Sequence, residues 1–440
     1  MTTRVDLAHL LRRATFGPRA DEVDAAERAG YSATLDALLA PAGPDAGAGR
    51  TPVPQLGPDP YLALPQNPDR ATRAKAQQQR RDQQRALVIW WLDRMVQADH
   101  QLPEKLTFFW HGHWATSIEK VDFAGLMLMQ QQTMAQLGRG DFGIMAKAML
   151  RDPALILFLD GQKNTRQAPN ENLSRELMEL FTLGIGHYTE DDVKAGARAL
   201  TGWTLNRSTG AAELKPARYD PGPKTILGRT GTFDTDGFAD ILLAQPANAE
   251  FLARRLWFRY VTGEPIGDGP LDRLVAAYRP GRDITALLRA LFSDAGFGST
   301  GGQLVKQPVE WCVGAMRQLG IRPGELADKD KVALLQGLGS LGQLPGRPPS
   351  VGGWPAGAAW LTTSSAQLRL RAADFLAVHA DVAVVATLTA VPDAQRVDAL
   401  ARLLVVDSFT DRTRAVLAGV AGDARKLISL GLASPEYSVM

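Results

Sequence analysis

The 440-residue sequence contains a single cysteine, Cys312, so it can form no intramolecular disulfide bond and no cysteine-based zinc site. Cys312 follows Trp311 in an apolar helical run, and we expect a buried, inert thiol. Long apolar runs are also missing, because no stretch approaches the roughly 20 apolar residues that a membrane span requires. Formal charges nearly cancel, to +2, and no basic surface with interleaved aromatic residues is visible. These properties argue against a membrane span and against a nucleic-acid partner.

The first eleven residues carry charges throughout and have no apolar signal core. We therefore expect a cytoplasmic protein, or an exported one if a leader has been removed. Hydrophobic residues make up 45% of the chain and charged residues 22%, the proportions of a globular protein with a substantial core.

Helical periodicity dominates the sequence, and strands do not alternate with helices. We therefore expect a mainly α fold, a single large helical domain over residues 1–440. Residues 41–68 collect eight prolines and predict a long Pro-rich loop inside it. Residues 203–235 are rich in Gly, Pro and Thr and predict a small irregular or β insertion. The expected helices that bear on the later argument run over 21–40, 69–98, 103–110 and 246–261.

The most distinctive segment, residues 169–180, has the pattern of an amphipathic helix. At about 100° per residue, its apolar and polar side chains fall on opposite sides. The apolar side holds Leu173, Leu177, Leu180 and Phe181, and the polar side holds Asn172, Arg175, Glu176 and Glu179, with Glu171 at its margin.

Glu176 and Glu179 are spaced i, i+3, so both carboxylates lie on one face. Paired carboxylates can hold a divalent cation or divide the roles of acid and base, and Arg175 would keep them ionised. The alternative is a salt-bridged, exposed helix face, which the spacing alone favours.

Two histidines, His111 and His113, flank Gly112 between two tryptophans. Imidazoles at i, i+2 point to opposite faces of a helix but to the same side of an extended segment. Gly112 favours a helix end at this point, beyond which both rings could converge on one metal ion or one anion. The alternative is two partly buried histidines that hydrogen-bond the backbone.

Three further polar residues lie in nearby loops. His187 precedes a helix that Thr189 is expected to cap, and it could serve as a base, a ligand or an anion contact. Asp220 and Lys224 bracket a rigid Pro-Gly-Pro turn. This turn could bind an anionic group, although a plain surface turn is the simpler interpretation.

Ordered motifs along nearly the whole chain give a resemblance to a known family. They are His9–Gly17, Phe109–His113, Asn170–Gly184, Tyr188–Glu190, Ala199–Trp203, Lys224–Gly228, Lys306–Pro308, Pro348–Pro349 with Gly353–Trp354, and Ser434–Tyr437. Together these motifs resemble the bacterial family called domain of unknown function 1800.

The resemblance implies one continuous helical unit and names no settled activity. Members of the family are commonly exported and often encoded beside a sulfatase-like partner, which suggests anionic or glycan substrates. The chain departs from the family at Tyr219, where a histidine usually precedes the aspartate.

Two main hypotheses follow, and a redox site built on the same ligands is a third option. In the first, the chain is a metal-assisted hydrolase acting on an anionic or glycan-type substrate. The metal ligands would be His111, His113 and Glu171, the catalytic residues Glu176, Glu179, His187 and Lys224, and the substrate-binding residues Asn172, Arg175 and Asp220. In the second, the chain is a non-catalytic binding or assembly protein. The same polar residues would form a buried network, and the Trp-rich loop 354–360 would meet a partner.

Overall fold

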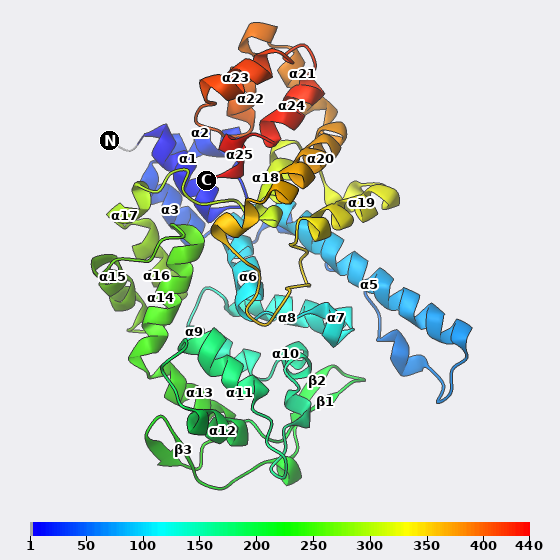
Figure 1. The fold of residues 1–440 in the computed structure, drawn as a ribbon, viewed down its shortest axis with the longest axis vertical. Coiled ribbons are helices and arrows are strands. Elements are labelled where there is room, and N and C mark those ends of the chain that lie inside the picture. The colour runs from blue at the N-terminus through cyan, green and yellow to red at the C-terminus, as the bar shows by residue number, and fades with distance from the viewer. Residues whose placement is uncertain (1–2) are drawn as a thin grey trace.

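The computed structural model describes residues 3–440 and consists almost entirely of packed helices (Figure 1). Helices account for 63% of the residues and strands for 5%. The mainly α fold expected from the sequence is therefore confirmed.

The N-terminal region forms short helices followed by the Pro-rich loop. The helices are α1 (Arg4–Ala14), α2 (Ala20–Ala29) and α3 (Tyr31–Leu39). Gly30 has φ 84°, a left-handed conformation that ends α2, so the single helix expected over 21–40 is wrong. Residues 41–68 contain only two short helical segments, α4 (Ala46–Gly49) and η1 (Pro60–Ala63), as the prolines predict.

Residues 70–199 contain the two helices that carry most of the predicted site residues, α6 and α11. The elements are α5 (Arg70–Gln97), α6 (Gln101–His113), α7 (Ile118–Val121), α8 (Ala124–Leu137), α9 (Phe142–Met149), α10 (Pro153–Phe158), η2 (Gly161–Lys163), α11 (Asn172–Glu176), the π-helix η3 (Leu177–Thr182) and α12 (Glu190–Ala199). The long helix α5 confirms the prediction over 69–98. The helix expected over 103–110 instead continues through His113, which changes the geometry of both histidines.

Two antiparallel hairpins form the insertion predicted near 203–235. Strand β1 (Trp203–Asn206) pairs with β2 (Ala211–Leu214), and β3 (Lys224–Ile226) pairs with β4 (Arg229–Gly231). Trp203 lies opposite Leu214, and Lys224 lies opposite Gly231. A single turn, η4 (Pro216–Arg218), connects the hairpins.

The remainder of the chain is mostly helical, and its connections include a loop over residues 343–356. Its elements are α13 (Thr235–Leu243), α14 (Pro246–Tyr260), α15 (Asp268–Tyr278), α16 (Ile284–Phe292), α17 (Ala295–Gly298), α18 (Pro308–Gln318), η5 (Pro323–Glu325), α19 (Asp328–Ser340), η6 (Gly357–Trp360), α20 (Thr363–His379), α21 (Val382–Thr389), α22 (Asp393–Leu403), α23 (Asp411–Ala418), α24 (Ala424–Leu432) and α25 (Pro435–Ser438).

Many of these helices begin at a side chain that accepts hydrogen bonds from the first turn. Asp69 accepts from the Thr72 amide at 2.6 Å, and Asp283 accepts from the Thr285 amide at 2.7 Å. Thr189 and Asp192 form the reciprocal pair expected at the start of α12. Such caps satisfy backbone donors that have no partner within the helix, and they explain where these helices start.

Helix α6 lies between the two largest hydrophobic clusters of the protein and near the centre of the view in Figure 1. Trp110 packs in the cluster formed by α9, η3 and the α13–α16 helices. Phe108 packs in the cluster formed by α5, α18 and the C-terminal helices. Cys312 is buried in this second cluster, and burial raises the pKa of its thiol to about 12, as expected of an inert cysteine.

Over residues 3–440, no helix taken alone combines the length and the apolar character that a membrane crossing requires. Helices α20 and α21, bent by 94° relative to each other, meet the length and composition criteria only as a pair.

Candidate functional site

The two histidines of α6 point into different parts of the protein. Because the helix continues through His113, the prediction that both rings lie beyond the helix end is wrong. The His111 Nε2 accepts a hydrogen bond from the Gly346 amide at 2.9 Å, and its ring packs against Trp91 and Trp354. His113 instead contacts η3, where its Nε2 lies 3.0 Å from the Phe181 carbonyl oxygen.

Burial and these hydrogen bonds together determine which nitrogen atoms of the two rings carry a proton. Burial lowers the pKa of His111 to about 3, so Nε2 is free to accept the Gly346 hydrogen bond. Burial and the nearby positive charge of Arg255 hold the pKa of His113 well below its usual value. Since a carbonyl can only accept, the His113 Nε2 carries the proton, and its buried Nδ1 is left without a partner.

The predicted metal ligands do not come together. Glu171 lies half-buried at the start of residues 171–182, which comprise α11 and η3 and which we call the acidic helix or acidic segment. It forms an ion pair with Arg175 at 3.1 Å, while both histidines form hydrogen bonds with the backbone elsewhere. Among the residues from 3 to 440, no three His, Cys, Asp or Glu side chains are arranged to hold a metal ion. The residues present in this region therefore do not fit the predicted divalent cation.

The acidic helix is a half-exposed surface on which most charges are paired. Arg175 donates two hydrogen bonds of 2.7 Å to Glu190 in addition to its contact with Glu171. Glu179 accepts a 2.6 Å hydrogen bond from the Tyr188 hydroxyl. This arrangement matches the salt-bridged face that the spacing favoured, and it is not the buried network of the second hypothesis.

The other two polar residues of the acidic helix differ in their environment. The Asn172 side chain donates to the Leu159 carbonyl at 3.3 Å and so links α11 to the end of α10. Glu176 forms no ion pair within residues 3–440, and burial together with the negative charge of Glu179 raises its pKa, although the charge of Arg175 acts in the opposite direction. After Glu176 the chain continues as a π-helix, in which hydrogen bonds run from i to i+5, so a rotation of 100° per residue no longer applies.

The predicted loop residues are similarly separated. His187 is exposed in a turn, and Asp220 forms a 2.7 Å ion pair with Arg198. Lys224 is buried, with 2% of its surface exposed, and its ammonium donates to the Asp220 and Gly222 carbonyls at 2.7 and 2.8 Å. The Tyr219 ring lies 5.4 Å from this ammonium, so Tyr219 helps to enclose Lys224. Lys224 therefore stabilises the turn and is not free to bind a substrate.

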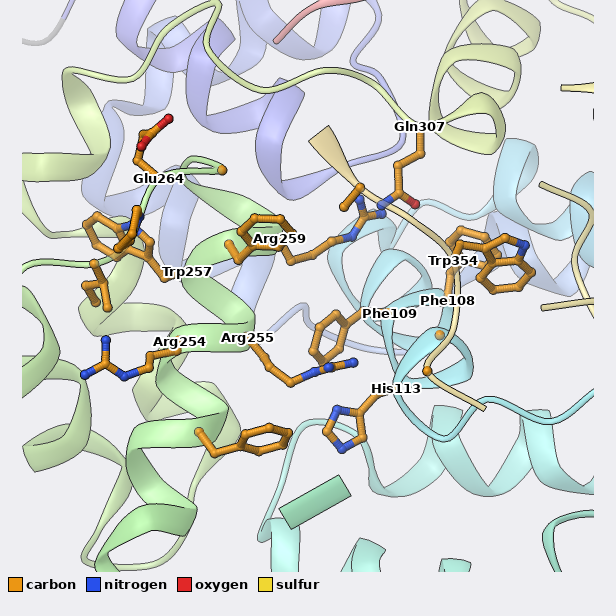
Figure 2. A pocket seen from close by; sticks show the side chains of 18 residues that line it. Phe108, Phe109, His113, Arg254, Arg255, Trp257, Arg259, Glu264, Gln307 and Trp354 are labelled. Atoms are coloured by element: carbon orange, nitrogen blue, oxygen red, sulfur yellow. The ribbon is translucent and has the colours of Figure 1, made fainter. Parts of the chain in front are cut away.

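A pocket of about 540 Å³ lies between α6, α14 and the loop over 343–356 (Figure 2). This volume is in the range of small-molecule sites. Its lining is mainly apolar, and its polar side chains are His113, Gln307, one carboxylate, Glu264, and three arginines. The aromatic residues that line it are Phe108, Phe109, Phe251, Trp257, Phe258 and Trp354.

Helix α14 contributes three arginines to this pocket, and one of them, Arg255, lies 5.6 Å from the centroid of the Phe251 ring and forms no ion pair with any residue from 3 to 440. Arg259 forms a 3.0 Å ion pair with Glu310, and Arg254 lies 3.9 Å from Glu250. Arg255 extends from α14 towards Phe109 and His113 (Figure 2), and no carboxylate in the described part of the chain, residues 3–440, pairs with it. Burial lowers its pKa to about 10, so the guanidinium is charged at neutral pH.

The Trp-His-Gly-His-Trp motif explains how the opposite side of the pocket is built. Gly353 adopts φ 85° and lies so close to the Gly112 carbonyl that any Cβ would collide with it. This approach, together with the hydrogen bond from Gly346 to His111, holds the loop against α6 and places Trp354 in the pocket. The two histidines are thus buried residues that hydrogen-bond the backbone, as the alternative interpretation proposed.

The sequence analysis did not identify this pocket. The one available signal was the i, i+4 series Phe251, Arg255 and Arg259, which places an aromatic ring and two cations on one face of α14. The partners of that face come from segments far away in the sequence, so the pattern alone could not separate a pocket from a solvated helix surface.

Comparisons with curated proteins and with solved structures find no match. A family model described as "Protein of unknown function (DUF1800)" matches residues 9–439, in agreement with the resemblance carried by the ordered motifs. The chain therefore belongs to the DUF1800 family.

Proposed function

We propose that the protein binds a small molecule that carries an anionic group on an aromatic or sugar ring, in the pocket between α6, α14 and the 343–356 loop. The observation that supports this proposal is the Arg255 guanidinium, which lies in an aromatic pocket without a carboxylate partner among residues 3–440.

The charge of Arg255 favours an anionic ligand on energetic grounds. Arg255 is partly exposed, and even partial removal of a guanidinium from water is unfavourable unless an anion replaces the lost hydration. A charge-assisted hydrogen bond to a bound anion contributes about 1.5–3 kcal/mol, which corresponds to roughly a 10- to 150-fold gain in affinity. Arg255 is therefore suited to recognise the charge of a ligand.

The remaining lining favours a ring. Aromatic side chains stack on flat apolar surfaces, including the faces of sugars and aromatic rings. Gln307 and Glu264 add polar groups to the lining. A ring that bears hydroxyl groups offers hydrogen-bond partners for both side chains, in keeping with the expectation of anionic or glycan substrates.

A thermal-unfolding screen tests the proposal. The probes are 4-nitrophenyl sulfate, 4-nitrophenyl phosphate and 4-nitrophenyl glucuronide, each at fixed ionic strength. We expect at least one of them to raise the unfolding temperature in a saturable way, because a ligand that binds only the folded state stabilises it.

In the Arg255→Gln variant the shift is expected to disappear, while an Arg412→Gln control, at an exposed position on α23, retains it. If no anionic probe shifts the wild-type protein up to about 5 mM, or if the Arg255→Gln variant responds as the wild type does, the proposal is wrong.

Hydrolysis is a second candidate, at the acidic helix, and one observation favours it. Glu176 is half-buried, and burial and Glu179 raise its pKa in spite of the nearby charge of Arg175, as is typical of a general acid. Release of 4-nitrophenol from the same probes, absent in a folded Glu176→Gln variant, would support this function. No release above the rate in buffer would exclude it for these substrates.

A further inference from the structure

Gln307 lines the pocket at the point where helix α18 begins (Figure 2). Pro308 occupies the first position of the helix, and Gln307 precedes it as the N-cap residue. The Gln307 backbone amide donates to the Glu310 Oε2 at 3.0 Å, and the same buried carboxylate lies 3.0 Å from the Arg259 guanidinium. One carboxylate therefore holds Gln307 and Arg259 at the same end of the pocket.

The side-chain amide of Gln307 is oriented by two hydrogen bonds that start at a backbone donor. The Val309 amide, in the first turn of α18, has no partner within the helix and donates to the Gln343 Oε1 at 2.9 Å. Because a backbone N–H can only donate, this contact identifies the oxygen of the Gln343 amide. The Gln343 Nε2 then donates to the Gln307 Oε1 at 2.7 Å. Gln343 is completely buried, so water does not compete for these hydrogen bonds.

The part of the Gln307 amide that remains for a ligand is a hydrogen-bond donor. Since Gln343 holds the Oε1 atom, the Nε2 group is the free corner of the amide. Over residues 3–440 this nitrogen has no acceptor, yet it does not belong to the enclosed, unpaired polar atoms of the protein. The Nε2 of Gln307 is therefore accessible, and it offers N–H groups of fixed orientation on the pocket wall.

The distance between this donor and the charge of Arg255 is set by helix α14. Arg255 and Arg259 are four residues apart on the helix, which is a rise of about 6 Å. Arg259 is engaged by Glu310, so Arg255 remains the cation for the anionic group of a ligand. Gln307 lies at the Arg259 end, about one helical turn further along. Substituents on opposite carbon atoms of a six-membered ring have a comparable separation.

We propose that Gln307 determines the specificity of the pocket, and that the ligand is a ring acid with a carbonyl or hydroxyl oxygen on the side opposite its anionic group. The inference rests on the function proposed above, in which Arg255 binds the anionic group. Gln307 donates to the ligand oxygen, whereas an ammonium group at this position faces another donor and finds no acceptor. Gln343 does not line the pocket and is a positioning residue that acts through Gln307.

Calorimetry with benzoate, 4-acetylbenzoate and 4-(aminomethyl)benzoate tests the inference on the full-length protein. All three carry the anionic group for Arg255, and they differ only in the group opposite to it, which is hydrogen, a carbonyl acceptor or an ammonium donor. We expect 4-acetylbenzoate to bind about three- to tenfold more tightly than benzoate, and 4-(aminomethyl)benzoate to bind more weakly than benzoate. Equal affinities of the two substituted benzoates would contradict the inference.

Two variants test the roles of the glutamines through the ratio of these affinities. Gln307→Glu still accepts from Gln343 but presents an oxygen to the ligand, so we expect the preference to reverse in favour of 4-(aminomethyl)benzoate. Gln343→Met removes the orienting hydrogen bond without touching the ligand, and the preference for 4-acetylbenzoate should nearly disappear. A wild-type ratio in Gln307→Glu would overturn the inference. That variant and the wild type decide the question even if Gln343→Met does not fold.

The same titrations distinguish a failure of this inference from a failure of the proposed function. If none of the three benzoates binds at up to about 5 mM, or if Arg255→Gln binds them as the wild type does, the proposed function is wrong and the inference falls with it. If all three bind through Arg255 with the same affinity, only the role of Gln307 is wrong.

Discussion

Two charged helices of this protein show opposite behaviour. On the acidic segment, Arg175 is paired with Glu171 and Glu190 at the surface, where water already solvates all three groups. On α14, Arg255 is enclosed in an aromatic pocket, and no carboxylate within residues 3–440 compensates it. The acidic segment, which has the most distinctive pattern in the sequence, is thus the one whose arginine is already paired within the folded protein.

The difference shows which charges indicate function. A paired surface charge contributes little and can be replaced, whereas an unpaired charge in a cavity reduces stability unless a ligand binds. Clusters of charged letters in a sequence do not distinguish these cases, because pairing depends on residues that are distant along the chain.

The largest effect is expected at the carboxylate behind the pocket. Glu310→Gln leaves Lys105 and Arg259 buried without an anion, so we expect a loss of about 3–5 kcal/mol in the free energy of unfolding. Urea denaturation measures this loss. Glu190→Gln, at an exposed position paired with Arg175 of the acidic segment, is the matched control and should leave the midpoint unchanged. Equal effects at the two positions would remove the contrast between the regions.

The next largest loss of stability is expected at the buried His113 and not at the exposed His187. His113→Ala leaves the Phe181 carbonyl unsatisfied in the core, so we expect the free energy of unfolding to fall by about 1–3 kcal/mol. His187→Ala, in an exposed turn, should have no measurable effect. A stable His113→Ala variant would show that His113 does not hold η3 against α6.

Glu176 provides a prediction with a defined pH dependence. Burial and Glu179 raise its pKa in the folded state, so its protonated form is the one that the fold favours. Its contribution to stability is therefore present below the ordinary pKa of a glutamate, near 4.5, and is lost as pH rises through the folded pKa.

We accordingly expect Glu176→Gln to be at least as stable as the wild type at pH 7, with a difference that shrinks as the pH is lowered to about 4. Urea midpoints at both pH values measure it. The hypothesis of a buried polar network requires the opposite, a loss of several kcal/mol on this substitution.

The smallest effect is expected at the paired surface charges. Arg175→Gln should cost about 1 kcal/mol or less, because both of its ion pairs are partly exposed. The cost should disappear in about 1 M salt, where screening is strong. A larger effect that persists in salt would mean that the acidic segment is more tightly coupled to the core than its exposure indicates.

Most of the fold was predictable because its signals are local. The helix over 69–98, the cap at Thr189 and the Pro-rich loop over 41–68 depend on signals within a few residues, and the structure confirms each of these predictions. The exceptions involve glycine. Gly30 breaks a helix that appeared continuous, whereas Gly112 sits inside a helix that appeared to end there.

The candidate site could not be derived in the same way. Extending α6 by three residues turns His111 and His113 to opposite sides, so one helix boundary determined the predicted metal site. The π-helix after Glu176 changed the rotation that the sequence analysis assumed. The pocket requires α6, α14 and the Trp354 loop to meet, and no local pattern encodes that contact.

The most direct test of the account compares two ligands that differ only in charge. Dissociation constants for 4-nitrophenyl glucuronide and the neutral 4-nitrophenyl glucoside would be measured by calorimetry with the wild-type and Arg255→Gln proteins. We predict that the substitution weakens glucuronide binding by about tenfold or more and leaves glucoside binding nearly unchanged. An equal change for both ligands, or none for either, would contradict the claim that Arg255 recognises an anionic group.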